Sequence, residues 1–586
     1  MVLVGSPAAA ILRATTVEKA EAAALRRAAH SMAPVLLADA PLVGAVLGLA
    51  LLGFFLPAAG PRLRGLVVAA RIAALGLFLA QALDAGLLNV LLMRLRLEDV
   101  ARFWNEGKAG LSLAVGLQRW VGRAVPPAVL GAAVALSLAA WAAAFLTSPF
   151  ARRTRFGLVR TGAIASLALV SMAAVPADGT RFHGWAYPNV VVANLPPSTT
   201  KPYSPAYLAR AARARRGTEA GAGRNLRANV VLYVVESLSS VQSARFGGLH
   251  DWTPQLDALA GRGLAPEEFH ANGYTTNLGL IALLTGRVPL PPAGADFAES
   301  FAPFLDGPSL PRALSAHGYY TEFLTTSDLG FTRKGEWLER IGFESTRGSR
   351  DPAFEGWPRF AFDAAPDEAL VTATVARERE LRGRAGARPF FLVAETATSH
   401  MPFVHPVGSD HTEGGVFRYV DAQIGRLARL LEESGFFENG LLVVVSDHRK
   451  MAPLDPDEAA RWPYGAFSRV PFVALGRGVS PGHPAGPFQQ ADLYGSLLCL
   501  LTPSCPVAPF RGALFDDPPR PPACLLSPMS NDRELVYVRC GKDEAMVRFD
   551  GDATRVARGR IDPALVSEVL REIAVVRSEN VAVPWP

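Results

Sequence analysis

The stretch NVVLYVVES, residues Asn229–Ser237, decides the fold class. It is a continuous apolar run of strand length, rich in valine, that ends in polar residues. FFLVAET (Phe390–Thr396) and LLVVVSDH (Leu441–His448) have the same form, and helical patterns such as Tyr419–Ser434 lie between the runs. Strands that are apolar on both faces are typical of a parallel sheet covered by helices. The sequence therefore predicts an α/β domain over residues 227–586, with a mostly parallel central sheet.

Polar side chains end two of these runs. Glu236 closes the first run, and Asp447 and His448 close the third. Ligands of open α/β sheets bind beyond the carboxyl ends of the strands, so these side chains are candidate site residues. Between them, FHANGYTTNLGLIALLTGR (Phe269–Arg287) predicts a loop and then a helix that begins near Thr276. A hydroxyl at a helix N-terminus lies in a positive field that favours a bound phosphate or sulfate.

Together these residues offer carboxylate, imidazole and hydroxyl ligands to one divalent metal ion. The set suits Mn²⁺, Mg²⁺ or Zn²⁺, of which we expect Mn²⁺. A bound cation acidifies a coordinated hydroxyl, which makes a threonine a competent nucleophile. Taken singly, a threonine at a helix start is usually an N-cap, and Asp-His after a strand can be a turn. The order of the residues and their places at strand ends favour the catalytic interpretation.

The composition indicates membrane segments. Half of the 586 residues are apolar, and the net charge is +6. This length predicts at least two domains. The apolar excess lies in the N-terminal third, and many basic residues stand beside apolar spans, a pattern typical of cytoplasmic loops. No basic patch interleaved with aromatic residues occurs elsewhere in the sequence, so nucleic-acid binding is not expected.

Residues 34–177 are predicted as a transmembrane domain of about four helices, since a bilayer core needs roughly 20 helical residues. The apolar stretches run over residues 41–59, 65–93, 124–150 and 161–177. Asp84 interrupts the second stretch and is interpreted as a polar contact inside the helix bundle, with a functional group as the alternative.

The arginines of residues 151–160 predict a cytoplasmic loop, which places the chain after about residue 177 outside the cytoplasm. The N-terminus then lies outside too, or a further weak element precedes the first helix. Residues 1–33 are predicted as a lead, either a surface helix or poorly ordered. Residues 178–226 are a juxtamembrane linker whose arginines are solvated or contact lipid phosphates.

All four cysteines lie late in the chain, and none forms a CxxC pair, so a zinc knuckle is not expected. Outside the cytoplasm, one or two disulfides are expected, with buried free thiols as the alternative. The cysteines are Cys499, Cys505, Cys524 and Cys540.

These motifs resemble those of the lipoteichoic acid synthase and phosphoglycerol transferase branch of the alkaline-phosphatase/sulfatase superfamily. The resemblance covers about residues 230–510. It implies a multi-pass protein of a bacterial inner membrane with an extracytoplasmic, periplasmic catalytic domain. It also implies metal ligation by Glu236 in NVVLYVVESLSS and by Asp447 and His448 in VVVSDHRK.

The nucleophile loop of that branch is similar to GYTTNLGLIALLTGR, where Thr275 and Thr276 compete. The sulfatase signature has its nucleophile ten residues before the Gly of TGR, and counting back from Gly286 gives Thr276. The Asn-x-Gly-Leu spacing favours Thr276 as well. Neither Cys nor Ser stands at this position, and the x-Pro-x-Arg of sulfatases is missing, so sulfatase activity is not expected.

The resemblance further implies a substrate site. His400 in ATSHMPF is expected to contact the phosphate or carry a proton. Arg333, with Phe331 beside it, is the candidate phosphate-binding arginine, and a plain surface arginine is the alternative. Arg449 stands where a Gly is usual, and either crowds the site or binds phosphate. His405 and His411 are solvated loop residues or ligands of a second metal.

The expected function is therefore transfer of phosphoglycerol from a phospholipid to a glycan or lipid acceptor through a phospho-Thr276 intermediate. The alternatives are phosphoethanolamine transfer, hydrolysis of a phosphate or sulfate ester, and a catalytically silent lipid-binding protein.

Overall fold

The computed structural model describes the chain in segments: residues 2–25, 33–55, 64–91, 94–95, 189–194, 204–214, 219–290, 301–360, 363–384, 386–401, 403–452, 454–507, 510–529, 535–550 and 552–579. The chain divides into two compact units, and each is described by itself. The smaller unit comprises Met1–Asn105, Leu117–Pro197 and Ala452–Pro463. The larger unit comprises Glu106–Gly116, Ser198–Met451 and Tyr464–Pro586.

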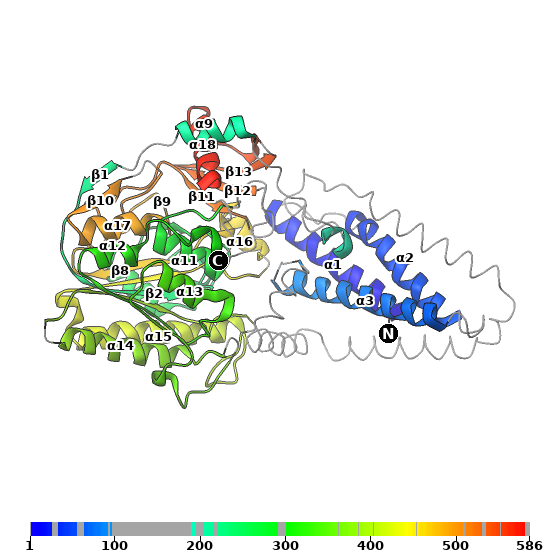
Figure 1. Ribbon diagram of the computed structural model, residues 1–586, viewed down its shortest axis with the longest axis horizontal. Helices are drawn as coiled ribbons and strands as arrows, with labels where there is room; N and C mark the ends of the chain where they lie inside the picture. Colours follow the sequence, from blue (N-terminus) through cyan, green and yellow to red (C-terminus); the bar gives the residue numbers. More distant parts are fainter. Residues whose placement is uncertain are drawn as a thin grey trace. The chain divides into compact units, whose positions relative to one another are not determined.

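A six-stranded sheet with the order β5-β4-β6-β2-β7-β8 forms the centre of the larger unit (Figure 1). All neighbours pair in parallel except β7 and β8, so the sheet is mixed, with one antiparallel edge strand. The three apolar runs of the sequence are the adjacent strands β6, β2 and β7. The strands are β2 (Asn229–Val235), β4 (Tyr320–Thr325), β5 (Ser345–Arg347), β6 (Phe390–Glu395), β7 (Gly440–Ser446) and β8 (Phe472–Gly476).

Alternate side chains of β2 enter two different cores, which explains why the strand is apolar at every position. Val230, Leu232 and Val234 belong to one core, and Val231, Tyr233 and Val235 to the other. The first core also contains residues of α11 (Thr276–Thr285), α12 (Leu310–Ala316), α13 (Lys334–Arg340) and α17 (Asp492–Leu501). The second contains residues of α10 (Pro254–Arg262), α14 (Asp367–Gly383) and α15 (Glu413–Glu433).

The first residues of α11 and α15 can be compared with the starts that the sequence predicted. α11 begins at Thr276, as predicted, and ends at Thr285. Gly286 caps it with a φ of 67°, in the left-handed region that glycine favours. α15 begins at Glu413 rather than Tyr419, where Thr412 caps it by accepting a hydrogen bond from the Gly415 N–H. Two glycines in its first turn conceal this beginning in the sequence.

A C-terminal antiparallel sheet was not foreseen. Its strand order is β11-β12-β13-β14, and its side chains share a core with α18 (Pro563–Glu579). The strands are β11 (Leu525–Pro528), β12 (Leu535–Cys540), β13 (Asp543–Asp550) and β14 (Ala553–Gly559).

Two small sheets complete the larger unit. β1 (Glu219–Ala222) pairs with β10 (Ser504–Val507), and β3 (Glu268–His270) pairs with β9 (Pro487–Gln489). The end of the predicted linker thus forms a strand, and α9 (Pro205–Ala214) precedes it. Cys499 is bonded to Cys505 and Cys524 to Cys540, so the disulfide interpretation of the cysteines is confirmed and the free-thiol interpretation is wrong.

The described part of the smaller unit consists mainly of three helices that pack against one another. They are α1 (Val2–Leu25), α2 (Ala33–Phe55) and α3 (Arg64–Leu91), followed by the short α8 (Val190–Ala193); α16 (Pro456–Arg461) groups with them. The first two predicted spans correspond to α2 and α3, and most of the predicted lead is α1. The predicted spans at 124–150 and 161–177, and the loop between them, lie outside the described residues.

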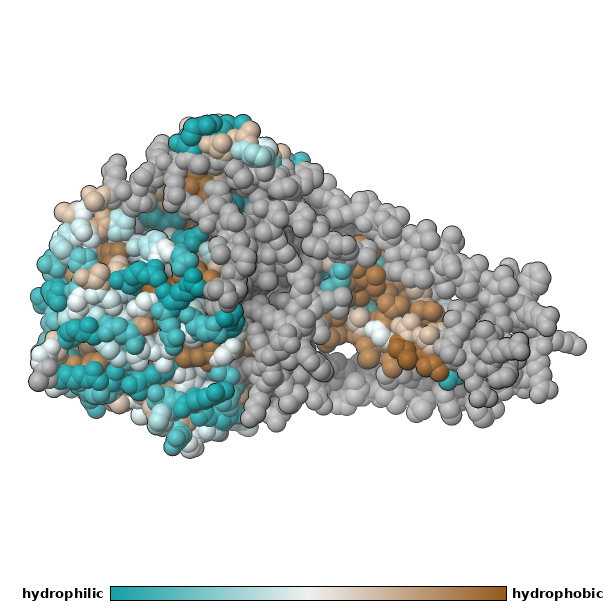
Figure 2. Space-filling model, in the orientation of Figure 1, coloured by the Kyte–Doolittle hydropathy of each residue, from teal (hydrophilic) through white to brown (hydrophobic). Residues whose placement is uncertain are grey.

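Within the described residues, Val68–Leu88 of α3 is long and apolar enough to cross a membrane. Figure 2 shows hydrophobic surface over the smaller unit and a largely hydrophilic face on the larger one. Asp84 in α3 is buried, and its Oδ1 accepts hydrogen bonds from Arg94 Nε and the Leu95 N–H, each at 2.9 Å. This geometry agrees with the interpretation of Asp84 as a polar contact inside the helix bundle.

Candidate functional site

The carboxyl ends of two adjacent strands carry three of the candidate side chains. Glu236 follows β2, while Asp447 and His448 follow β7. β2 and β7 pair in parallel with Val235 opposite Ser446, so the two strands end together. One ligand atom from each of Glu236, Asp447 and His448 lies within 4.8 Å of the others, and all three side chains are buried.

Thr276 reaches this group from the N-terminus of α11. Its Oγ1 donates a hydrogen bond to Glu236 Oε2 at 3.1 Å and lies 3.4 Å from His448 Nε2. The neighbouring Thr275 is the N-cap residue, and its buried hydroxyl has no hydrogen-bond partner among the residues that the structure describes. Of the two competing threonines, the structure brings the hydroxyl of Thr276 to the group.

A glycine allows α11 to approach this closely. A Cβ atom on Gly279 would lie 2.0 Å from the backbone oxygen of Asp447. The same oxygen accepts a hydrogen bond from Gln490 Nε2 at 2.6 Å, and Gln490 Nε2 also donates to the Ser446 oxygen at 2.7 Å. Gln490 thus holds the end of β7 in place, a role that the sequence did not reveal.

The two carboxylate oxygens of Asp447 have different surroundings. Oδ1 accepts hydrogen bonds from the backbone N–H groups of Ser237 at 2.8 Å and His448 at 2.7 Å. Oδ2 is buried 3.3 Å from His448 Nε2 and has no hydrogen-bond partner among the described residues. An ionised carboxylate with one buried oxygen left unsatisfied needs a cation nearby.

Hydroxyl groups after β6 hold Glu236 in place. The Glu236 N–H donates to Thr396 Oγ1 at 2.9 Å, and Ser399 Oγ donates to the Glu236 backbone oxygen at 2.5 Å. Ser237 Oγ donates to Glu236 Oε1 at 2.6 Å. Sequence reasoning missed Thr396 and Ser399, although both follow an apolar run at the same edge of the sheet as Glu236.

The backbone of Arg449 orients the His448 ring. His448 Nδ1 lies 2.7 Å from the Arg449 carbonyl oxygen, which can only accept, so Nδ1 carries the proton and donates. The lone pair of Nε2 is then available to a metal ion. The Arg449 side chain is buried, and its Nη1 donates to the Lys450 oxygen at 2.8 Å.

Burial and electrostatic interactions within the group shift the pKa values of its side chains. Burial, and next the charge of Glu236, raise the pKa of Asp447 well above its usual range. Burial lowers the pKa of His448 and so favours the neutral ring. Burial raises the pKa of Glu236, but the positive charge that His448 and His400 carry when protonated and the hydrogen bonds from Ser237 and Asp447 outweigh burial, so its pKa is lowered. Two buried carboxylates and a neutral imidazole fit a divalent cation, which would supply the missing positive charge.

His400 lies beside the group, in the loop after β6. It is half-buried, its Nδ1 lies 2.5 Å from the Met401 oxygen, and it is close enough to affect the pKa values of Glu236 and His448. The structure therefore brings His400 near the group. His405 and His411 instead stabilise a loop, because His411 Nδ1 accepts the His405 N–H at 3.0 Å. Among the described residues, neither belongs to a cluster of potential metal ligands.

The turn that carries Phe331 and Arg333 lies next to α11, because Thr332 Oγ1 is 3.3 Å from Asn277 Nδ2. Thr332 and Arg333 have φ values of 56° and 55°, which are strained for residues with a Cβ atom. The Arg333 side chain is 47% exposed and pairs with Glu336 at 2.5 Å. The structure thus brings the turn to the nucleophile helix but places the Arg333 guanidinium in a surface ion pair.

A buried ion pair also lies at this edge of the sheet and was not foreseen. Lys334 Nζ lies 2.8 and 2.9 Å from the carboxylate oxygens of Glu395, the last residue of β6. The charge of Glu395 contributes to the raised pKa of Asp447. The ends of β6, β2 and β7 therefore each carry a buried carboxylate, one of which is neutralised by a lysine.

Comparison with known proteins finds similarity over the residues that carry the site. The family model described as Sulfatase matches residues 228–502. Phosphoglycerol transferase I from Xanthomonas campestris pv. campestris (strain B100) is 26% identical over 443 residues, which cover 68% of this chain and 57% of that protein. This chain thus spans little more than half the length of that curated relative.

Two solved structures are also similar. A protein in the alkaline phosphatase superfamily from Vibrio parahaemolyticus is 20% identical, with a TM-score of 0.48, and the match covers 65% of this chain and 91% of that one. The lipoteichoic acid synthase LtaP from Listeria monocytogenes is 19% identical, with a TM-score of 0.47 and coverages of 62% and 94%. Residues 228–502, which supply Glu236, Thr276, Asp447 and His448, form a sulfatase-family domain related to the phosphoglycerol transferases, the branch that the sequence motifs indicated.

Proposed function

We propose that this protein is a membrane-anchored, metal-dependent phosphotransferase that moves phosphoglycerol from a phospholipid to a glycan or lipid acceptor. The observation that carries the proposal is the position of Thr276 Oγ1, 3.1 Å from Glu236 Oε2 and 3.4 Å from His448 Nε2. The similarity to phosphoglycerol transferase I supports phosphoglycerol as the transferred group.

Glu236, Asp447, His448 and Thr276 would hold one divalent cation. Mn²⁺ is the expected ion, and Mg²⁺ and Zn²⁺ suit the same ligands. When bound, it would acidify the Thr276 hydroxyl and stabilise negative charge on the phosphate. The unsatisfied Asp447 Oδ2 and the lone pair of His448 Nε2 support this ligand set.

The chain's own residues position the reaction. Thr276 Oγ1 gives its proton to solvent and attacks phosphorus, and the bond from phosphorus to the diacylglycerol oxygen breaks. That oxygen takes a proton, for which His400 is the candidate donor. Phosphoglycerol is then esterified to Thr276. An acceptor hydroxyl next gives its proton to His400 and attacks the same phosphorus. The bond from phosphorus to Thr276 Oγ1 breaks, and Oγ1 regains a proton from solvent. The backbone N–H groups at the start of α11 favour the phosphate throughout.

Arg333 and Phe331 complete the proposed substrate site. Arg333 would exchange its exposed pair with Glu336 for the substrate phosphate, and such a surface pair stabilises the fold by only about 0–1 kcal/mol. The hydrogen bonds between Thr332 and Asn277 support this assignment, because they attach the turn to α11 next to Thr276.

The location of the protein is part of the proposal. A donor held in the lipid bilayer would require a catalytic domain at the membrane, and Val68–Leu88 offers a helix that can span it. Disulfides persist in oxidising compartments, so the Cys499–Cys505 and Cys524–Cys540 bonds support a periplasmic catalytic domain. We therefore place the protein in the bacterial inner membrane as a multi-pass protein.

The test is intact-mass analysis of the full-length protein after incubation with phosphatidylglycerol vesicles and Mn²⁺, without an acceptor. We expect one phosphoglycerol on the peptide Phe269–Arg287 and none in Thr276→Ala. Thr275→Val is the matched control, because it removes only a hydroxyl that has no hydrogen-bond partner among the described residues, and it should be labelled like the wild type.

An adduct in Thr276→Ala would reject the nucleophile. An adduct from phosphatidylethanolamine but not from phosphatidylglycerol would replace phosphoglycerol by phosphoethanolamine. No adduct, together with release of free glycerol phosphate, would identify a hydrolase.

A further inference from the structure

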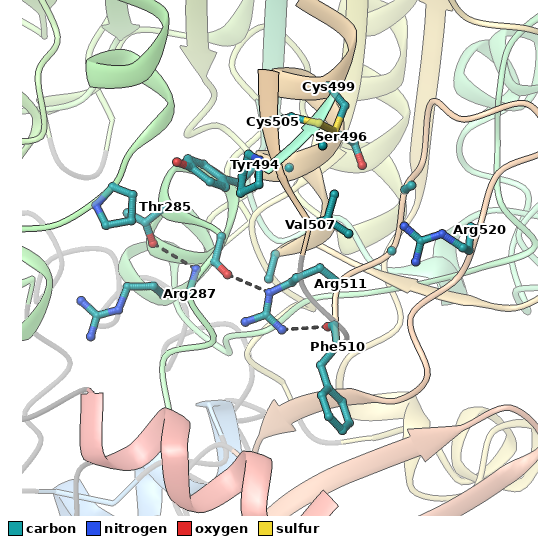
Figure 3. A pocket seen from close by; sticks show the side chains of 18 of the residues that line it. Thr285, Arg287, Tyr494, Ser496, Cys499, Cys505, Val507, Phe510, Arg511 and Arg520 are labelled. Carbon is teal, nitrogen blue, oxygen red and sulfur yellow. Dashed lines mark hydrogen bonds between the residues drawn. A yellow bond between two sulfur atoms is a disulfide. The ribbon is translucent and has the colours of Figure 1, made fainter. Parts of the chain in front are cut away.

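A cavity of about 620 Å³ lies in the larger unit, apart from the proposed metal ligands and nucleophile (Figure 3). None of Glu236, Thr276, Asp447 and His448 lines it. It lies at the other end of α11, where Thr285, Gly286 and Arg287 form part of its wall. Because α11 has ten residues, its two ends are about 15 Å apart. The cavity and the proposed nucleophile therefore occupy opposite ends of one helix.

Positive charge dominates the wall. Five arginines line the cavity, against three carboxylates. They are Arg224, Arg287, Arg511, Arg520 and Arg571. Arg571 lies a loose 4.0 Å from one of the described lining carboxylates, Glu568. An excess of guanidinium groups in a concave wall favours an anionic ligand.

Backbone carbonyls hold two of these arginines. Arg511 Nε donates to the Gly286 oxygen at 3.0 Å and its Nη1 to the Phe510 oxygen at 2.8 Å (Figure 3). Arg224 Nη1 donates to the Gly478 oxygen at 2.8 Å. A carbonyl orients a guanidinium without cancelling its charge, so the charge remains available to a ligand.

Arg520 is exposed, and its side chain makes no hydrogen bond or ion pair with any residue that the structure describes. Its backbone is fixed, because Arg520 and Ala513 exchange both N–H to oxygen hydrogen bonds. The guanidinium therefore extends from a fixed backbone position and can bind a ligand without breaking a contact with the described residues. Figure 3 shows Arg520 and Arg511 around the same cavity.

The rest of the wall suits an organic group. Tyr494, Val507 and Phe510 contribute ring and aliphatic surface (Figure 3). Burial raises the pKa of Tyr494, so its hydroxyl stays protonated and can donate to a ligand. The Cys499–Cys505 disulfide ties α17 to β10, two walls of the cavity. The volume is in the usual range for small-molecule sites and far exceeds that of a bare phosphate ion.

We propose that this cavity is a binding site for an organic phosphate ester, separate from the metal centre. Arg511 and Arg520 bind the phosphate, and Tyr494, Val507 and Phe510 contact the carbon-bearing part. The site needs neither the metal nor Thr276, so it goes beyond the proposed transfer reaction and does not depend on it.

The test is calorimetric titration of the full-length, detergent-solubilised protein with glycerol 1-phosphate after EDTA has removed divalent metal. Binding should persist without metal and weaken as salt is added. Arg511→Gln/Arg520→Gln should bind about tenfold or more weakly, because two charge-assisted contacts are lost. Arg350→Gln is the matched control: Arg350 is an exposed arginine outside the cavity, and its variant should bind like the wild type.

Arg520→Gln alone changes an exposed side chain that has no partner in the part of the chain that the structure describes, so it keeps the test valid if the double variant does not fold. Binding that EDTA abolishes, or that neither arginine variant weakens, would overturn the proposal. Equal affinity for inorganic phosphate would overturn the assignment to an ester. Thr276→Ala should bind normally, so failure of the transfer reaction and failure of this site give different results.

Discussion

Gly279 of α11 lies directly against the backbone carbonyl of Asp447: a Cβ atom at Gly279 would stand 2.0 Å from that oxygen. The helix that begins with the proposed nucleophile therefore touches the loop that carries two proposed metal ligands. This contact sets the distance between Thr276 and the Glu236–Asp447–His448 group.

Gly279→Ala should reduce transfer activity about 100-fold while the protein stays folded, because the added methyl group forces α11 and the Asp447 loop apart. Transfer from phosphatidylglycerol measures the loss, and circular dichroism the fold. Gly261→Ala is the control, since Gly261 is an exposed helical glycine with no atom within 4 Å of an added Cβ. Full activity in Gly279→Ala would contradict the proposed contact.

Removing the metal with EDTA should abolish transfer and lower the unfolding temperature, and Mn²⁺ should restore both. Without the metal ion, the buried carboxylates lose the positive charge that compensates them. An ion present at 100 times its Kd stabilises the folded state by about 2.7 kcal/mol. Asp447→Asn keeps an oxygen for the Ser237 and His448 N–H groups but removes the charge. Its unfolding temperature should no longer respond to Mn²⁺; an unchanged response would remove Asp447 from the ligand set.

Thr396→Val should lower metal affinity about 10- to 100-fold, because the Glu236 N–H loses its acceptor and Glu236 is held less firmly. Thr396→Ser should restore the affinity, since the hydroxyl returns. Thr372→Val, at an exposed position of α14, is the control. Metal titration of the metal-free protein measures the effect. Loss of stability with unchanged metal affinity would mean that Thr396 has only a structural role.

Lowering the pH should decrease the free energy of unfolding of the larger unit, because Glu268 becomes protonated. Burial opposes its ionisation, but the hydrogen bond from His270 and the charges of Arg469 and Arg539 lower its pKa from 4.5 to about 2. A carboxyl with a lowered folded-state pKa stabilises the fold above its unfolded pKa and loses that stabilisation as the pH falls. Roughly 3 kcal/mol should therefore disappear between pH 4.5 and about 2.

Thermal unfolding measured across this pH range tests whether protonation of Glu268 causes the loss of stability. Glu268→Gln should show a shallower loss of stability, because it keeps an acceptor but has no charge to titrate. Glu432→Gln, at an exposed surface ion pair, should follow the wild type. Identical curves for Glu268→Gln and the wild type would assign the acid transition to other groups.

The sequence predicted the strands at the centre of the fold because they are buried on both faces and must be apolar at every position. β2, β6 and β7 match the quoted runs to within two residues. Elements with weaker constraints were harder to predict: β13 and β14 belong to an antiparallel sheet that no continuous apolar run announced. α15 began earlier than predicted, because glycines in its first turn interrupt the helical pattern.

By itself, the sequence determined which residue types end the central strands and begin α11, since a parallel sheet brings strand ends to one edge. Only the tertiary structure decided how they are held: Asp447 Oδ1 by two backbone N–H groups, Glu236 by Thr396 and Ser399, and Arg333 in a pair with Glu336. Such contacts join segments far apart in the chain, and their geometry depends on how helices pack on the sheet. No local pattern of residues contains that information.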